Sequence, residues 1–228
     1  MESDQEIQNA AIAIVSFTGS YVQNKQRKQN EQQESESTLS LAQVTSRLES
    51  LWRQIDMNKS SKYVIRIPKL LQSLIALATF RLGTHLREQT DLLRLEVRRQ
   101  SKLCLECIQG WGDEQIQPEI VNQEYGRVMT LSFCTAGGVG EEKDMEILNG
   151  LDHFYYFLRQ LHEGRNDGYL PSFQPLPLLV RITEEQIEED GANEEIDAQI
   201  KNNGQYSNIK ILGNYVKAVI LNHFINRR

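Results

Sequence analysis

Long hydrophobic runs are missing from this chain of 228 residues. No stretch approaches the roughly 18 consecutive apolar residues that a membrane-spanning helix needs, so the sequence predicts no such helix. The first residues, MESDQEIQNA, lack a basic segment followed by an apolar one, which excludes a typical secretory signal. Three cysteines do not make the even set of a disulfide framework. We therefore expect reduced thiols and a cytoplasmic location, with the nucleus as the alternative.

Strand-like patterns are also lacking. Nowhere do β-branched and aromatic residues alternate with polar ones, whereas Leu, Ile, Glu, Gln and Arg are abundant. Most of these side chains lose little rotamer freedom in a helix. Apolar residues make up 39% of the chain, which is enough for a core, while the mean hydropathy of -0.49 predicts a strongly polar surface. The composition therefore favours an all-α fold.

Helical periodicity is clearest in residues 40–56, where apolar residues recur at i, i+3, i+4 and i+7. Similar stripes predict helices at residues 6–25, 67–82, 87–109, 125–136, 145–163, 178–202 and 211–224. Gly or Pro marks most of the connections. Each stripe must be buried, so we expect either an irregular helical bundle or an α-solenoid of stacked helix pairs or triplets.

A change of composition divides the chain near its N-terminus. Residues 26–37 are rich in Gln and Glu and contain no apolar side chain, so they cannot contribute to a core. The sequence thus predicts an N-terminal helix at 1–25, a flexible linker at 26–37 and a helical domain at 38–228.

Several predicted helices end by running into Gly or His, at irregular intervals of about 25 to 30 residues. Examples are GRVMTLSFCTAGG and NGLDHFYYFLRQLHEGR. From Ile67 onward the chain resembles armadillo/HEAT-type helical-repeat proteins, most closely uncharacterised protist members, some of which are fused to kinase domains. The resemblance implies an armadillo-like fold and a scaffolding role, and it transfers no functional residue. The kinase signatures HRD and DFG do not occur in this chain.

Two motifs have a structural explanation as well as a chemical one. Cys104 and Cys107 form a CxxC, but both lie on the apolar stripe of a helix and no second pair of closely spaced metal ligands is evident. The sequence AGGVG at 136–140 follows no predicted strand and precedes no Lys-Ser/Thr, which favours an interhelical turn over a phosphate loop. We predict no metal and no cofactor.

Residues 62–102 are rich in basic side chains, with nine Lys or Arg against three acids. Four of the basic residues fall near one helix face: Arg87, Arg94, Arg98 and Lys102. Such a face can bind an acidic peptide, a phosphorylated partner or a nucleic-acid backbone. The alternatives are a solvated face or pairing with acids of the same chain. These four residues are the candidate partner-binding residues.

An acidic segment at 184–197 holds eight Asp or Glu and no Lys or Arg. Like charges at i, i+4 destabilise a helix, so we expect basic groups from this chain or from a partner to offset them. The ligand pattern of a calcium loop is absent. Acids also lie near His153 and His162, but no nucleophile accompanies them in a recognisable arrangement, so we predict no catalytic residues.

A formal net charge of -6 argues against nucleic acid as the main partner. The leading prediction is a non-catalytic protein-interaction scaffold whose helical groove binds a partner segment, either acidic or phosphorylated. One alternative is a regulatory or accessory module of an enzyme such as a kinase. The other is an unrecognised helical enzyme, which would need an enclosed pocket of polar groups with shifted pKa values.

Overall fold

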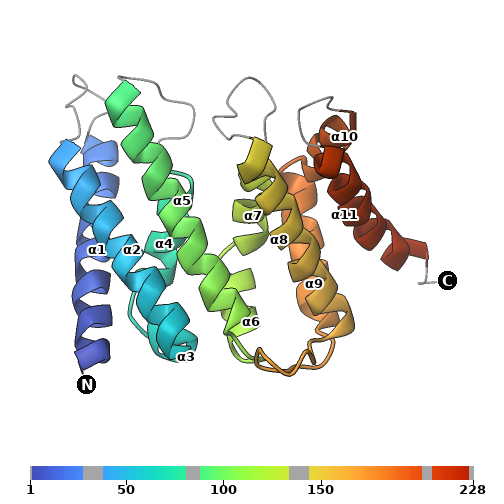
Figure 1. Cartoon of the computed structure of the whole chain (residues 1–228), viewed down its shortest axis with the longest axis horizontal. Coiled ribbons are helices and arrows are strands. Elements are labelled where there is room, and N and C mark those ends of the chain that lie inside the picture. The colour runs from blue at the N-terminus through green and yellow to red at the C-terminus, as the bar shows by residue number, and fades with distance from the viewer. Residues whose placement is uncertain (1, 28–37, 81–87, 134–143, 202–206, 226–228) are drawn as a thin grey trace. The chain divides into compact units, whose positions relative to one another are not determined.

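Helices form the regular secondary structure of this protein in a computed structural model (Figure 1). The structure describes residues 2–27, 38–80, 88–133, 144–201 and 207–225. In chain order the helices of these ranges are α1 (Glu2–Arg27), α2 (Thr38–Asn58), α3 (Ser61–Val64), α4 (Leu70–Ala78), α5 (Glu88–Gly110), α6 (Ile116–Val121), α7 (Tyr125–Phe133), α8 (Asp144–Glu163), α9 (Pro177–Glu189), α10 (Ala192–Lys201) and α11 (Ser207–Ile225). The described residues include no strand, which confirms the all-α class.

The chain divides into two compact units, Met1–Gly112 (unit 1) and Asp113–Arg228 (unit 2). This division differs from the predicted one, which set residues 1–25 apart from a single domain at 38–228. Helix α1 packs against α2 and α4, so its apolar stripe belongs to the core of unit 1. Most of the predicted linker lies outside the described residues.

Unit 1 is built on α2 and α5. Helix α1 runs antiparallel to α2, since Gln54 of α2 donates a hydrogen bond to Glu6 of α1. Helix α5 packs against α2, α3 and α4. The core side chains that these helices share include Ile7, Ile14, Leu41, Leu48, Leu51, Leu74, Val97 and Leu105. Burying one such side chain contributes about 1.5–3 kcal/mol, so a set of this size can hold the unit together.

Unit 2 has its own core. Helix α7 packs against α8 and α9, and α11 packs against α8 and α10. Aromatic rings of α7 and α8 meet in two pairs, Tyr125 with Phe157 at 5.1 Å and Phe133 with Phe154 at 5.3 Å between ring centroids. Gly150 of α8 packs so closely on α7 that an added Cβ would lie 2.5 Å from the hydroxyl of Ser132.

Two predicted helices have different boundaries in the structure. The helix predicted at 178–202 is two helices, α9 and α10, because Gly191 adopts a φ of 71° and turns the chain between them. The helix predicted from residue 67 begins at Leu70, because Lys69 has a left-handed φ of 64°. Positive φ at a non-glycine residue is uncommon, and it does not change the spacing of apolar residues. Periodicity alone therefore does not reveal it.

A helix triplet occurs in both units. Each triplet has a short helix, a nine-residue helix and a long helix, namely α3–α4–α5 in unit 1 and α6–α7–α8 in unit 2. Lys69 and Glu124, 55 positions apart, both have positive φ and immediately precede the nine-residue helix. The sequence predicted intervals of about 25 to 30 residues between single helix ends. The triplets are instead about 55 residues apart, which is roughly twice that interval.

The long helices of the two triplets bury the same face at a fixed offset of 53 positions. The buried residues of α5 that correspond in this way to buried residues of α8 are Arg94, Val97, Arg98, Ser101, Cys104, Leu105 and Ile108. Their counterparts in α8 are Ile147, Gly150, Leu151, Phe154, Phe157, Leu158 and Leu161. Two arginines of α5 therefore occupy positions that are aliphatic in α8.

Candidate functional site

The predicted basic face of α5 is only partly on the surface. Arg94 and Arg98 are buried, with 3% and 1% of their surface exposed. Lys102 is partly exposed, and Arg87 lies outside the described residues. The prediction of one accessible face is therefore wrong for Arg94 and Arg98. Both share the helix side of Val97, which packs into the core of unit 1.

These arginines make contacts inside unit 1. Arg98 donates from Nη1 to the carbonyl oxygen of Phe80, just beyond the end of α4, at 3.2 Å. Carbonyls at a helix C-terminus lack intrahelical donors and favour a cation, so the position of Arg98 stabilises the end of α4. Arg94 Nη1 lies 3.6 Å from a carboxylate oxygen of Asp91, one turn earlier on α5.

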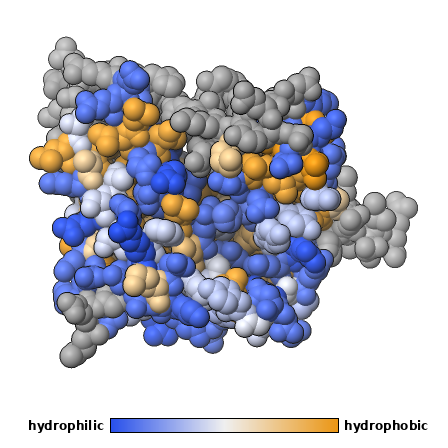
Figure 2. Space-filling view, viewed as in Figure 1, coloured by the Kyte–Doolittle hydropathy of each residue, from blue (hydrophilic) through white to orange (hydrophobic). Residues whose placement is uncertain are grey.

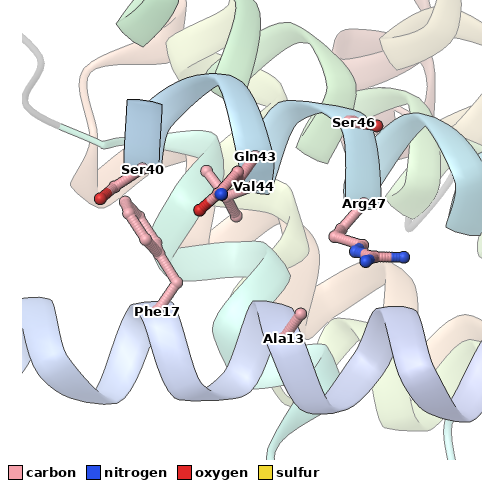
Figure 3. A pocket seen from close by; sticks show the side chains of 7 residues that line it. All are labelled: Ala13, Phe17, Ser40, Gln43, Val44, Ser46 and Arg47. Carbon is pink, nitrogen blue, oxygen red and sulfur yellow. The ribbon is translucent and has the colours of Figure 1, made fainter. Parts of the chain in front are cut away.

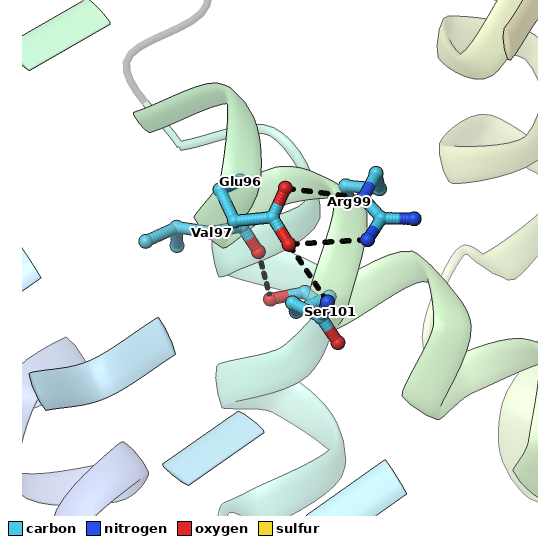
Figure 4. Close-up of polar contacts among 5 residues, drawn as sticks. Glu96, Val97, Arg99 and Ser101 are labelled. Carbon is cyan, nitrogen blue, oxygen red and sulfur yellow. Dashed lines mark hydrogen bonds and ion pairs between the residues drawn. The ribbon is translucent and has the colours of Figure 1, made fainter. Parts of the chain in front are cut away.

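Arg99, also counted in the basic segment, is paired within its own helix (Figure 4). Its Nε and Nη2 donate to the two carboxylate oxygens of Glu96 at 3.1 and 3.2 Å. Glu96 also accepts a hydrogen bond of 2.7 Å from Gln100. Arg94, Arg98 and Arg99 therefore make contacts within α5 or with the neighbouring chain segment of unit 1.

The acidic segment at 184–197 is offset by basic groups of unit 2. Three contacts connect it to other elements: His162 with Glu184 at 3.7 Å, Arg127 with Asp190 at 3.4 Å, and Lys217 with Asp197. Burial raises the pKa of Asp190 and outweighs the opposing effect of Arg127. Internal pairing therefore accounts for at least part of the charge in this segment. His153 is exposed, and its Nδ1 lies 3.2 Å from the carbonyl oxygen of Asn149.

The CxxC thiols are held in their protonated form. Cys104 is buried and donates through Sγ to the carbonyl of Leu48 at 3.3 Å. Burial, together with the charge of Asp56, raises the pKa of Cys107 to about 12. Metal binding and nucleophilic attack both need the thiolate, which such a pKa disfavours. In the described part of the chain, no three His, Cys, Asp or Glu residues are grouped to hold a metal ion. The AGGVG sequence at 136–140 lies outside the described residues.

A groove of about 560 Å³ runs between α1 and α2, which we call the α1–α2 groove (Figure 3). Its lining residues are Ala13, Phe17, Ser40, Gln43, Val44, Ser46 and Arg47. Phe17 rises from α1 toward α2 at one end, and Arg47 extends from α2 toward α1 at the other. The ring of Phe17 also meets that of Phe80, with centroids 5.8 Å apart, so the core supports this wall.

Among the described residues that line the α1–α2 groove, Arg47 carries the only charge. Residues 7–24 of α1 and 38–46 of α2 contain no charged side chain. Arg47 is exposed, and within the described ranges it makes no hydrogen bond or ion pair. Arg53, further along the same helix, is instead paired with Glu49 at 2.5 Å. The groove therefore offers one uncommitted guanidinium beside an uncharged, partly apolar surface.

Arg47 could not be predicted from the sequence, because it belongs to no dense cluster of one charge. A single cation between two uncharged helix stretches gives no such cluster, and the pairing of α1 with α2 is a tertiary contact. The available signal was the long uncharged surface of residues 7–24, which is unusual for an outer helix of so polar a chain.

None of the helices among the described residues is long and apolar enough to cross a membrane. Comparison with known proteins gives no match to any family model, curated protein or solved structure. The resemblance to armadillo/HEAT-type proteins accordingly stays a prediction from the sequence.

Proposed function

We propose that this chain is a non-catalytic protein-interaction module that binds an acidic, partly apolar segment of a partner protein in the α1–α2 groove. The observation that carries the proposal is Arg47, an exposed cation that makes no hydrogen bond or ion pair with the described residues, in a groove whose other described lining residues are uncharged. An armadillo-like arrangement of helix triplets is part of the proposal, and the triplet common to both units supports it.

The lining of the groove suits a peptide chain. Ala13, Phe17 and Val44 offer apolar surface for a side chain of the partner. The hydroxyls of Ser40 and Ser46 and the amide of Gln43 can pair with peptide N–H and C=O groups. A mixture of apolar and polar side chains is usual in a protein-interaction surface. These features favour an extended or helical protein segment as the ligand.

Charge selects the acidic class of partner. A guanidinium presents its donors in a planar fork that matches a carboxylate or a phosphate group. Because no carboxylate of the described residues pairs with Arg47, an incoming anion gains this interaction without displacing any of them. Arg47 is also the only titratable side chain among the described lining residues, an arrangement that favours binding over acid–base chemistry.

Selection from a random peptide library displayed on phage tests the proposal. Binders of the wild-type protein should be enriched in Asp or Glu next to an apolar residue. The Arg47→Ala variant should bind the selected peptides about tenfold more weakly, the typical loss of one hydrogen bond to a charged group. Arg53→Ala is the matched control, since it removes an exposed arginine of the same helix outside the groove. Equal effects of the two variants would contradict this site.

Synthetic versions of the selected peptides distinguish the two anions that Arg47 can recognise. A phosphoserine replacing the selected acid should bind more tightly if the natural ligand is phosphorylated, and no better than Asp if the site recognises a carboxylate. A peptide with Asn at this position should lose the same tenfold or so in affinity as the Arg47→Ala variant.

A further inference from the structure

A second surface, on α8 and α11 of unit 2, combines exposed aromatic rings with an acid that has no partner among the described residues. A groove of about 330 Å³ lies between the two helices, lined by Leu148, Asn149, Asp152, Asn208, Ile211 and Leu212. Residues 148, 152 and 155 of α8 and 208, 212 and 215 of α11 recur at helical spacing along this face, which we call the α8–α11 face. The two helices run in the same direction, because the residue numbers of both rise from the groove toward the contact between Tyr155 and Tyr215.

Three tyrosines continue the α8–α11 face beyond the groove. The ring of Tyr155 meets that of Tyr156 at 5.3 Å and that of Tyr215 at 5.9 Å. Tyr156 and Tyr215 remain 49% and 54% exposed. Ile211, one turn before Tyr215 on α11, is also exposed. Hydrophobic residues emerge at the surface over α8 and α11 in the space-filling view (Figure 2). A cluster of large side chains left open in this way is typical of an interaction surface.

Asp152 supplies the charge of this face. It is partly buried in the groove lining, and among the described residues it has no hydrogen-bond or ion-pair partner. The nearest Lys or Arg along α8 is Arg159, which is already paired with Glu163 at 2.9 Å. Unit 2 as a whole carries 19 acidic and 10 basic residues, a net charge of -9. The local and the overall charge both favour a cationic ligand.

We infer that the α8–α11 face binds a basic protein segment that places an arginine on the tyrosine cluster with its guanidinium at Asp152. Arginine stacks on aromatic faces and forms a planar, bidentate pair with a carboxylate, so one side chain uses both features. The aliphatic lining formed by Leu148, Ile211 and Leu212 then accommodates a neighbouring apolar side chain of the ligand. Asn149 and Asn208 can donate to and accept from its backbone.

Fluorescence anisotropy with short labelled peptides built from Arg, Leu and Ser tests the inference on the full chain. These peptides should bind the wild-type protein, and peptides with Glu in place of Arg should not. Asp152→Asn should weaken binding about tenfold, the expected cost of losing a charge-assisted hydrogen bond. Tyr156→Ala should weaken it about threefold or more through the lost cation–π contact.

Glu189→Gln is the matched control for charge. Glu189 is exposed on α9 of the same unit and has no partner among the described residues. If Glu189→Gln and Asp152→Asn weaken binding equally, the peptides respond to net charge alone and the inference is wrong. It is equally wrong if a single-stranded DNA of the same length is bound more tightly than the basic peptides.

The inference and the proposed function can fail separately. Arg47→Ala alters unit 1 and should leave the affinity for the Arg-containing peptides unchanged. Asp152→Asn should likewise leave the acidic peptides selected on the α1–α2 groove unaffected. Circular dichroism of each variant should match that of the wild type, since all four side chains are at least partly exposed.

Discussion

Gly164 is a residue at which backbone conformation and packing both matter. It has a φ of 79°, and an added Cβ would lie 2.7 Å from the carbonyl oxygen of Phe173. This approach belongs to the antiparallel bridge between Arg165 and Phe173, which ties the Pro-rich segment to the end of α8. Because backbone cannot move aside as a flexible side chain can, any larger residue must disrupt the bridge.

We expect Gly164→Ala to lower the free energy of unfolding by about 2–4 kcal/mol. The alanine would be strained at a positive φ, and its Cβ would collide with the carbonyl oxygen of Phe173. Gly168→Ala is the control, since Gly168 has a similar φ of 77° but no atom within 4 Å of an added Cβ. It should cost only about 1 kcal/mol. Urea denaturation of the two variants separates the effects, and equal losses would show that the predicted collision is absent.

Cys107 should make stability depend on alkaline pH. Its pKa is raised from 9.0 to about 12 by burial, so above pH 9 the unfolded state loses the thiol proton before the folded state does. The folded state then binds more protons, and stability falls as the pH rises from 9 toward 12. At pH 10 the loss should be on the order of 1 kcal/mol.

The measurement for Cys107 is urea denaturation at pH 8 and pH 10. Wild type should lose more stability between the two pH values than Cys107→Ala does, because the variant lacks this titration. Identical losses in the two proteins would mean that Cys107 is not protected as the structure indicates.

At the scale of elements, the sequence predicted most helices because buried residues recur at helical spacing. For example, the predicted helices at 40–56 and 145–163 lie within α2 and α8. The turns at Lys69 and Gly191 were missed, because a left-handed residue changes the chain direction without changing the periodicity. The burial of Arg94 and Arg98 was not predicted, because the sequence shows only that the helix carries basic residues. Which side of α5 is exposed depends on its packing against three other helices.

Arg98 of α5 and Leu151 of α8 occupy corresponding positions, and we expect exchanging arginine and leucine there to affect stability unequally. Leu151→Arg should lower the free energy of unfolding by more than about 3 kcal/mol, because it places an unpaired charge in an apolar core. Arg98→Leu should cost about 1–3 kcal/mol, since an apolar side chain suits the position but the carbonyl of Phe80 loses a donor.

Thermal and urea denaturation followed by circular dichroism measure both changes. Ile147→Val, a conservative change one turn earlier on α8, provides the baseline for that helix and should cost about 0.5–1.5 kcal/mol. A larger loss for Arg98→Leu than for Leu151→Arg would contradict the assignment of equivalent positions. Charge reversal at Arg98 should destabilise unit 1, so it is unsuitable as a test of partner binding.

At the scale of the whole molecule, each unit has a buried core of its own. We therefore expect the fragments 1–112 and 113–228 to fold separately. Each should have a helical circular dichroism spectrum and a cooperative urea transition. The Leu151→Arg change should abolish the transition of fragment 113–228. A fragment that is unfolded as wild type would show that its core is incomplete without the other unit.

Charge also differs between the units. Unit 1 has 15 basic and 12 acidic residues, a net charge of +3, whereas unit 2 has a net charge of -9. The net charge of the whole chain, -6, does not reveal this contrast. The difference agrees with the two proposed ligand classes, acidic segments on the α1–α2 groove and basic segments on the α8–α11 face.

A charge-swap experiment at Arg47 shows whether acidic segments bind in the α1–α2 groove. It measures Kd by isothermal titration for the selected acidic peptide and for the same peptide with Lys at the acidic position. Arg47→Glu should weaken binding of the acidic peptide by tenfold or more. The variant should also bind the Lys peptide better than the wild type does. Arg53→Glu should change neither affinity much. If Arg47→Glu and Arg53→Glu shift both affinities alike, Arg47 is not the contact and the α1–α2 groove is not the binding site.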